Sequence, residues 1–203
     1  MKEKILTMLE MQDAMNSKVN PDWRNAGSEW YRAIWTECAE MLDHYGWKWW
    51  KHQQPDMDQV KLEIVDIWHF AMSDLLIRGE STDEVAARIE TELPRPVEAG
   101  DIRQSIESLA LVTLQTKSAH VSEFAGLMQC AGLEFDDLFR MYVGKNVLNF
   151  FRQDHGYKDG SYIKVWAGRE DNEHLAEIMS SLDPDEAGFA DLVYQRLESA
   201  YPA

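Results

Sequence analysis

The stretch IVDIWHFAMSDLL, residues 64–76, is apolar on nearly every side of the helix that its pattern predicts. A helix that is apolar all round has to be covered on every face, either inside a helical bundle or in an interface between subunits. Pro55-Asp56 before it and Gly79 after it predict that this helix opens at residues 55–56 and runs to Arg78. The sequence therefore predicts an all-α helical bundle built around one central helix.

Helical periodicity also dominates the other segments, and no stretch of any length alternates as a strand does. We expect the second helix to begin at an N-cap, Ser28, and to carry an inward-facing set of residues: Trp30, Ile34, Trp35, Cys38, Met41 and Leu42. The other expected helices cover about 3–18, 81–93 behind a Ser81-Thr82-Asp83-Glu84 cap, 101–117, 120–131 and 134–153, with helical pattern again near Glu173 and from Asp185.

Composition narrows the class of protein. The chain has 203 residues, a hydrophobic content of 45% and a formal net charge of −16. Binding along a nucleic-acid backbone needs clustered cations, so we expect no nucleic-acid partner. Two cysteines are too few for a disulfide framework, and no apolar run approaches the ~20 residues of a membrane helix. We expect a cytoplasmic protein with no membrane partner.

The segment Leu93–Gly100 is rich in proline and is the best candidate for an internal joint, but it is short. No internal repeat or low-complexity tract divides the chain. We therefore interpret residues 1–203 as a single all-α domain.

Two pairs of carboxylates interrupt apolar helical segments: Glu37 with Glu40, and Glu63 with Asp66. Residues three apart project from one face of a helix, and buried acids need partners or a metal. Two such helices facing each other would gather four negative charges, which is unfavourable without a hard cation such as Mg²⁺. Either pair alone is also common on exposed helices. Asp43 continues the first series, so its membership stays open.

A di-iron carboxylate bundle is the alternative metal site, and it requires Glu-x-x-His from two helices. The third position after each Glu is acidic here. The single His69, three residues after Asp66, does not make that site. A ligand set of oxygens alone favours Mg²⁺ or Mn²⁺ over iron or zinc.

Aromatic and basic residues form two further blocks. Trp47-Lys48-Trp49-Trp50-Lys51 could stack on a base and touch phosphates, or its rings could cap the core at a helix end. In the second block, helical spacing puts Lys145, Asn149 and Arg152 on one face, a set suited to a nucleotide. The glycines of residues 155–160 could let backbone N–H groups approach an anion, although a glycine turn after a helix is ordinary.

These blocks resemble those of the all-α dimeric dUTPases, relatives of the MazG-type nucleoside triphosphate pyrophosphohydrolases. The likeness lies in residues 9–16 with Asn20 and Trp23, in residues 37–51 and 63–70, and in residues 144–153 with 156–158, in the family's order. The resemblance implies a homodimer that hydrolyses dUTP to dUMP and pyrophosphate with Mg²⁺ and so limits uracil incorporation into DNA. The resemblance also allows dUDP as a further substrate.

The resemblance also assigns roles to single residues. It implies that Glu37, Glu40, Glu63 and Asp66 ligate two or more Mg²⁺ ions, with Mn²⁺ as the alternative metal. The nucleotide-binding positions would be Gln12 and Asn16 for base recognition, Trp49 and Phe70 for packing on uracil, Asn149 for the base or deoxyribose, and Lys145, Arg152, Tyr157 and Lys158 for the phosphates, some of them across the dimer. We expect Glu37 to be the catalytic base that takes a proton from water.

Other readings of the same residues stay open. The first is the same chemistry on dCTP or on a broader set of deoxynucleotides. The second is a non-catalytic helical dimer that senses nucleotides or binds a partner. Amide groups that pair with uracil would be left unpaired by cytosine, which favours dUTP. The apolar central helix fits a dimer interface, but a monomeric bundle would also bury it.

Overall fold

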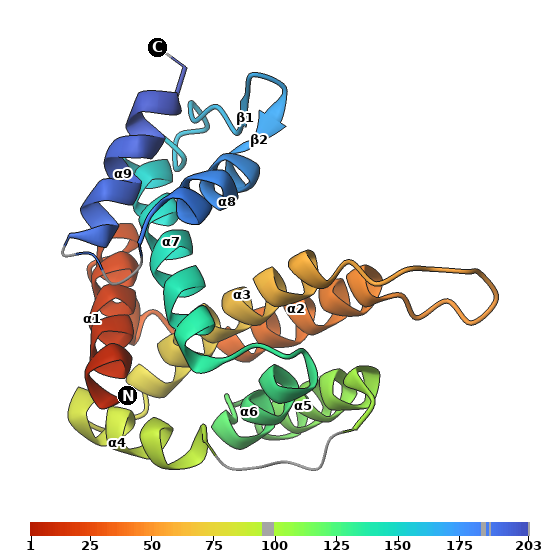
Figure 1. Ribbon diagram of the computed structural model, residues 1–203. Helices are drawn as coiled ribbons and strands as arrows, with labels where there is room; N and C mark the ends of the chain where they lie inside the picture. Colours follow the sequence, from red (N-terminus) through yellow and green to blue (C-terminus); the bar gives the residue numbers. More distant parts are fainter. Residues whose placement is uncertain (95–99, 184–185, 187, 203) are drawn as a thin grey trace. The chain divides into compact units, whose positions relative to one another are not determined.

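The computed structural model of the protein describes residues 1–94, 100–183, 186 and 188–202. They form two compact units, Met1–Phe139 and Arg140–Ala203, which we call the first and second units. Helices dominate both units (Figure 1), so the all-α prediction is confirmed. The single domain over residues 1–203 stays a prediction. Most of the expected joint, Leu93–Gly100, lies outside the described residues.

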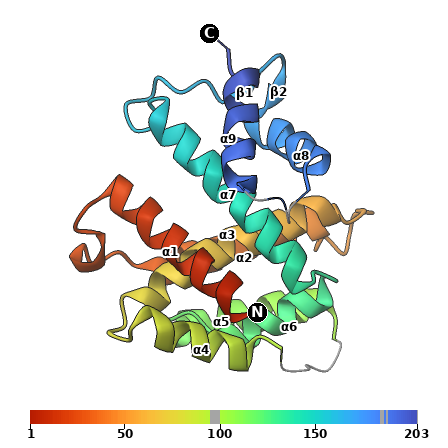
Figure 2. The same ribbon diagram turned by 60° about the vertical axis from the view of Figure 1, so that its left-hand side comes forward.

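The first unit contains α1 (Lys2–Val19), the 3-10 turn η1 (Trp23–Asn25), α2 (Trp30–Tyr45), α3 (Met57–Leu76), α4 (Thr82–Glu92), α5 (Ile102–Thr116) and α6 (Val121–Cys130). Helices α2 and α3 run side by side (Figures 1 and 2), and α5 packs against α2. Helix α3 also contacts α1, α4 and α6. It is therefore the central helix that its composition predicts.

Burial along α3 explains this position. Ile64, Val65, Trp68 and Met72 have no exposed surface, and the ring of Trp68 stacks on Phe124 of α6 at 4.6 Å between centroids. Asp56 caps the helix by accepting a hydrogen bond from the Gln59 N–H at 3.2 Å. The helices of the first unit thus cover the apolar surface of α3 within one chain.

Helix α2 differs from its prediction at two points. It begins at Trp30, so Ser28 is not its N-cap. Ile34, Cys38 and Met41 are buried, as expected, but Trp35 is 38% exposed. Residues spaced by four and three follow one stripe of a helix, and position 35 lies one step off the stripe that contains 34, 38 and 41. The helical period, rather than the apolar character of Trp35, decides which way this side chain points.

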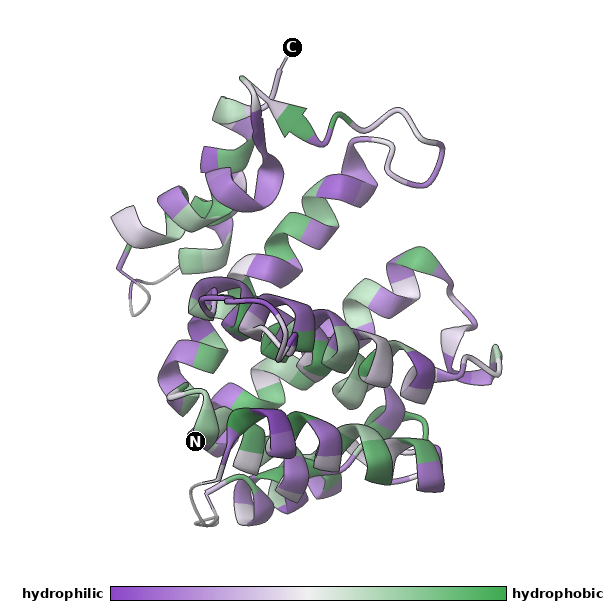
Figure 3. Cartoon of the chain, turned by 90° about the vertical axis from the view of Figure 1, so that its right-hand side faces the viewer, coloured by the Kyte–Doolittle hydropathy of each residue, from purple (hydrophilic) through white to green (hydrophobic). Residues whose placement is uncertain are grey.

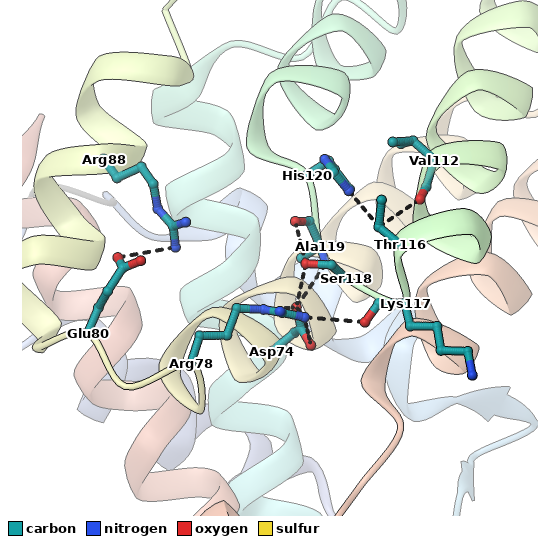
Figure 4. Close-up of polar contacts among 10 residues, drawn as sticks. All are labelled: Asp74, Arg78, Glu80, Arg88, Val112, Thr116, Lys117, Ser118, Ala119 and His120. Carbon is teal, nitrogen blue, oxygen red and sulfur yellow. Dashed lines mark hydrogen bonds and ion pairs between the residues drawn. The ribbon is translucent and has the colours of Figure 1, made fainter.

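A buried carboxylate ties the end of α3 to the segment between α5 and α6 (Figure 4). Asp74 is 4% exposed and accepts hydrogen bonds from Arg78 Nε at 2.8 Å and from the Ala119 N–H at 2.8 Å. Arg78 Nη2 also donates to the carbonyl oxygen of Lys117 at 3.3 Å. One acidic side chain therefore satisfies a cation and a buried backbone donor together.

Asp74→Asn should lower the free energy of unfolding by about 2 kcal/mol, because the amide removes the charge and one of the acceptors. Urea denaturation measures the change. Asp58→Asn is the control, since Asp58 is exposed on the same helix and its replacement should cost less than about 0.5 kcal/mol. Equal losses in the two variants would contradict this role of Asp74.

The second unit holds most of α7 (Phe135–Asp154), then β1 (Val165–Trp166), β2 (Arg169–Glu170), α8 (Asp171–Ser181) and α9 (Phe189–Ala200). The two strands pair antiparallel, with Trp166 opposite Arg169. Their turn residues Ala167 and Gly168 both have positive φ, as a two-residue hairpin turn requires. Strands of two residues are too short to show alternation, so the sequence did not predict this hairpin.

The core of the second unit is aromatic. Phe151 and Trp166 are almost fully buried, with centroids 5.8 Å apart, and the rings of Tyr194 and Tyr201 lie 5.4 and 5.2 Å from Phe151.

Hydrophobic and hydrophilic residues alternate along the helices of the chain (Figure 3), as expected of helices with one buried face. None of the helices in the described ranges has the length and apolar content to cross a membrane.

Candidate active site

The neighbouring helices α2 and α3 bring acidic side chains together. Glu37, Glu40 and Glu63 each place a carboxylate oxygen within 4.8 Å of the others, and we call these three residues the acidic cluster. Glu63 is 8% exposed, Glu37 is half-buried and Glu40 is exposed. His44, seven residues after Glu37 on the same face of α2, lies with Nε2 3.4 Å from Glu63 Oε1. The sequence analysis did not include His44.

Asp66 and Asp43 are placed differently with respect to the acidic cluster. The charge of Asp66 contributes to raising the pKa of Glu37, so Asp66 lies beside the cluster. Asp43 instead accepts a hydrogen bond from Trp47 Nε1 at 2.7 Å and lies 3.8 Å from Lys48 Nζ. The carboxylate of Asp43 therefore supports the tryptophan-rich segment.

Burial and neighbouring charges change the protonation of Glu37. Its pKa rises from 4.5 to about 8, first because burial disfavours the charged form. A hydrogen bond to Glu63, which requires the proton of Glu37, adds to the rise, and so do the charges of Asp66, Glu63 and Glu40. The cluster therefore carries more negative charge than its surroundings stabilise without a cation.

Polar side chains of α1 and α3 form a second group. His69 Nδ1 lies 2.7 Å from Gln12 Oε1, and Gln12 Nε2 donates to Asn16 Oδ1 at 3.0 Å. Asn16 Nδ2 donates to Ser73 Oγ at 2.9 Å, and that hydroxyl donates to the carbonyl oxygen of His69 at 2.9 Å. We call these four residues the amide group. Ser73 was not among the residues that the sequence analysis selected.

Asp13, the acidic residue after Gln12, has different hydrogen-bond partners from those of the amide group. It accepts a hydrogen bond from Trp23 Nε1 at 3.0 Å and forms an ion pair with Arg24 Nη2 at 3.0 Å. These contacts hold the 3-10 turn η1 against α1. The side chain of Asp13 is therefore structural, while Gln12 belongs to the amide group.

One face of α3 connects the acidic cluster with the amide group. Glu63, Asp66, Phe70 and Ser73 follow spacings of three, four and three, which keep them on one side of a helix. The rise from Asp66 to Ser73 is about 10 Å. Phe70 lies between them and stacks on Trp30 of α2, with centroids 6.3 Å apart. Carboxylates, an aromatic ring and amides thus follow one another along a single helix.

In the second unit, α7 continues through Arg152, so Lys145, Asn149 and Arg152 share one face of it. Arg152 is held by a wholly buried carboxylate: its Nε and Nη2 donate to Asp171 at 2.8 and 2.9 Å. Its Nη1 donates to Asn149 Oδ1 at 3.3 Å, and the Tyr162 hydroxyl donates to Asp171 at 2.9 Å. Sequence analysis missed Asp171 and Tyr162, because no spacing rule links them to Arg152.

Burial alone would raise the pKa of Asp171, but the hydrogen bonds and charge of Arg152 outweigh it and lower that pKa. Of the remaining predicted phosphate contacts, Lys145 is 8% exposed, whereas Tyr157 is 52% exposed and Lys158 is also exposed. The ring of Tyr157 lies 5.9 Å from the guanidinium carbon of Arg152. Arg152 therefore lies close to both Asn149 and Tyr157 within the second unit.

Comparison with known proteins fits this geometry. A protein-family model described as dUTPase matches residues 4–157. The chain belongs to the all-α dimeric dUTPase family. The matched span contains every residue to which the resemblance assigns a role except Lys158, whereas Tyr162, Asp171, α8 and α9 lie beyond it. No curated protein matched the chain.

Membership of the dUTPase family indicates dUTP hydrolysis and a nucleotide substrate, and the family generally depends on divalent metal ions. The acidic cluster fits such an ion by its chemistry, because it offers only carboxylate oxygens. Burial and the charge of Glu37 raise the pKa of Cys38 to about 12, so this neighbouring thiol keeps its proton and does not compete as a soft ligand.

The metal-free protein should lose about 2–4 kcal/mol of stability between pH 5 and pH 8.5, the upper figure following from about 1.4 kcal/mol per pH unit. Between about pH 4.5 and pH 8 folded Glu37 holds a proton that the unfolded chain has released, so its contribution disappears as pH rises through 8. Thermal unfolding in EDTA at a series of pH values measures this slope. Glu37→Gln should flatten the slope, and Mg²⁺ should restore stability above pH 7. Equal slopes in both proteins would contradict the origin in Glu37.

The structure does not bring Trp49 to Phe70. Trp49 is 90% exposed, and its ring contacts the edge of Trp50 at 5.4 Å between centroids, while Trp50 contacts Trp47 at 5.3 Å. The alternative that these rings cap the core is therefore wrong for Trp49. The segment leaves α2 through Gly46 at φ +90°, with Gln53 Oε1 accepting a hydrogen bond from the Lys48 N–H at 2.8 Å.

The glycine turn after α7 does not present a row of N–H groups to a ligand. The N–H groups of Tyr157 and Ser161 bond to the carbonyl oxygens of Arg152 at 2.9 Å and Gly156 at 3.0 Å. Gly156 has φ +86°, and Ser161 Oγ occupies the place where a Cβ would stand. The turn itself uses these backbone N–H groups. Gly156 therefore allows the turn that presents Tyr157 and Lys158, instead of binding an anion.

Proposed function

We propose that the protein hydrolyses dUTP to dUMP and pyrophosphate with Mg²⁺ held by the acidic cluster and Asp66. The observation that carries this proposal is the meeting of three carboxylates within 4.8 Å, one of which, Glu63, lies on the face of α3 that leads to the amide group. The triphosphate and the base are the two chemically distinct ends of a nucleotide, and the first unit offers a distinct group for each. Hydrolysis of dUTP would limit uracil incorporation into DNA.

The residues at the phosphate end have separate tasks. When bound, Mg²⁺ supplies positive charge that offsets the triphosphate and makes a neighbouring water more acidic. Glu37 takes a proton from that water, which it can do only in the ionised form that positive charge in the site favours. Lys145, Arg152 and Lys158 stabilise the charge that develops on the leaving pyrophosphate, and Tyr157 binds the phosphates with them.

The residues at the base end recognise uracil. Gln12 and Asn16 supply amide hydrogen bonds, and Phe70, supported from behind by Trp30, supplies an aromatic face. Trp49 would pack on the opposite face of the base, which requires its exposed segment to move inward. Asn149 contacts the base or the deoxyribose. We further propose that residues 1–203 act as one domain and that two copies of the chain form a homodimer.

Identification of the products tests the reaction. Incubation of the protein with dUTP and Mg²⁺, followed by ³¹P NMR, should show dUMP and pyrophosphate in equal amounts. A parallel sample with EDTA should show unchanged dUTP. The appearance of dUDP and orthophosphate would contradict cleavage between the α- and β-phosphates, and turnover in EDTA would contradict the role of the metal.

A further inference from the structure

We propose that Ser73 fixes the orientation of the Asn16 side-chain amide and thereby makes the base end select uracil over cytosine. This inference rests on the proposed function, which places the base at Asn16. It adds a specificity-determining residue that does not itself need to touch the nucleotide. The orientation of Asn16 follows from which atom donates in each hydrogen bond of the amide group.

The hydroxyl of Ser73 accepts a hydrogen bond from Asn16. A serine hydroxyl carries one hydrogen, and Ser73 donates it to the carbonyl oxygen of His69, four residues earlier in α3, at 2.9 Å. Ser73 is wholly buried, so water does not replace this partner. The atom of Asn16 that faces Ser73 at 2.9 Å is accordingly the donor, Nδ2.

Gln12 imposes the same orientation from the other side. Its Nε2 donates to Asn16 Oδ1 at 3.0 Å, while its Oε1 faces His69 Nδ1 at 2.7 Å. A reversed Asn16 would place its Nδ2 against the donor of Gln12 and would make the Ser73 hydroxyl leave the His69 carbonyl to donate to Oδ1. Reversal would thus replace one hydrogen bond by a repulsive contact and break the bond from Ser73 to the His69 carbonyl, in a part-buried environment.

The fixed amide offers the base one donor and one acceptor. An asparagine side chain has two N–H groups and an oxygen with two lone pairs, and the hydrogen bonds recorded for Asn16 among the described residues use one N–H and one lone pair. The half-buried Asn16 can therefore still accept the N3–H of uracil and donate to the adjacent carbonyl oxygen. Cytosine carries a lone pair at N3, so Oδ1 would face another acceptor.

A freely rotating asparagine would lose this discrimination, because turning the amide over presents a donor to N3 of cytosine. Ser73→Ala removes the acceptor that prevents the turn. The ratio of kcat/KM for dUTP to that for dCTP should then fall by about fivefold, mainly because turnover of dCTP rises. The measurement is steady-state pyrophosphate release from each nucleotide with Mg²⁺.

Two further variants make the test decisive. Ser73→Cys nearly preserves the volume but accepts hydrogen bonds weakly, so it should also lower the ratio even if Ser73→Ala folds poorly. Ser199→Ala removes the same kind of bond, from Ser199 Oγ to the Gln195 carbonyl, on an exposed part of α9, and it should leave the ratio unchanged.

If Ser73 is purely structural, both Ser73→Ala and Ser73→Cys lower the melting temperature and slow the turnover of dUTP and dCTP equally. An unchanged ratio of the two kcat/KM values in both variants overturns the inference. That outcome leaves the proposed function standing, because the unmodified protein still prefers dUTP. Absence of turnover of either nucleotide by the unmodified protein overturns the proposed function and this inference together.

Discussion

Glu40→Gln should lower kcat for pyrophosphate release from dUTP by about a thousandfold or more, while the protein stays folded. Glu40 is exposed, so its replacement leaves no buried group unpaired. Its carboxylate oxygen lies within 4.8 Å of those of Glu37 and Glu63, and a neutral amide is a much weaker ligand for Mg²⁺. The loss should therefore appear in the chemistry rather than in stability.

Asp43→Asn is the matched control for this variant. Asp43 is also exposed on α2, three residues after Glu40, but its carboxylate binds Trp47 and Lys48. Its replacement should change kcat by less than about threefold. Steady-state kinetics at saturating dUTP and Mg²⁺ compare the two variants. Similar losses in both would show that the negative charge of α2, rather than the acidic cluster, matters for turnover.

Asp171→Ala should lower the free energy of unfolding by about 3–5 kcal/mol, because it leaves Arg152 as a largely buried cation without its carboxylate. Asp171 has no exposed surface, and Arg152 has only 13% of its side chain exposed. The hydroxyl of Tyr162 loses an acceptor as well. Chemical denaturation gives the free energy, and hydrogen exchange should show the added opening in residues 140–202.

Glu177→Ala provides the comparison, because Glu177 lies on the same helix α8 and pairs with Arg169 at 2.8 Å in an exposed position. An exposed ion pair contributes about 0–1 kcal/mol, so this variant should remain close to the unmodified protein. If Asp171→Ala is no more destabilised than Glu177→Ala, the buried pair does not hold the second unit together.

The parts of the fold that were predictable are those that local sequence determines. The continuous apolar pattern of residues 64–76 identified the central helix, and Ser81 with Glu84 identified a capping box, whose two hydrogen bonds are 3.3 and 2.8 Å long. The hairpin at residues 165–170 was missed because two-residue strands carry no periodicity. Trp35 was misplaced because hydrophobicity outweighed helical phase in its assignment.

The candidate site likewise has residues that local sequence predicts and residues that it does not. Paired acids at helical spacing indicated which carboxylates could meet, and the structure brings Glu37, Glu40 and Glu63 together. Ser73 and Asp171 were not predicted, because each acts through a hydrogen bond to a residue far away in sequence. These partners are Asn16 and Arg152. Such contacts depend on how helices pack, and a single sequence contains no rule that pairs them.

We propose that this chain is a metal-dependent hydrolase of dUTP, and kcat/KM for pyrophosphate release measures that activity. The measurement compares dUTP, dCTP, dTTP and UTP while free Mg²⁺ is raised from zero. We predict turnover that requires Mg²⁺ and a clear preference for dUTP over the other three nucleotides. Absence of turnover with every nucleotide at every Mg²⁺ concentration would show that the protein is not a dUTP hydrolase.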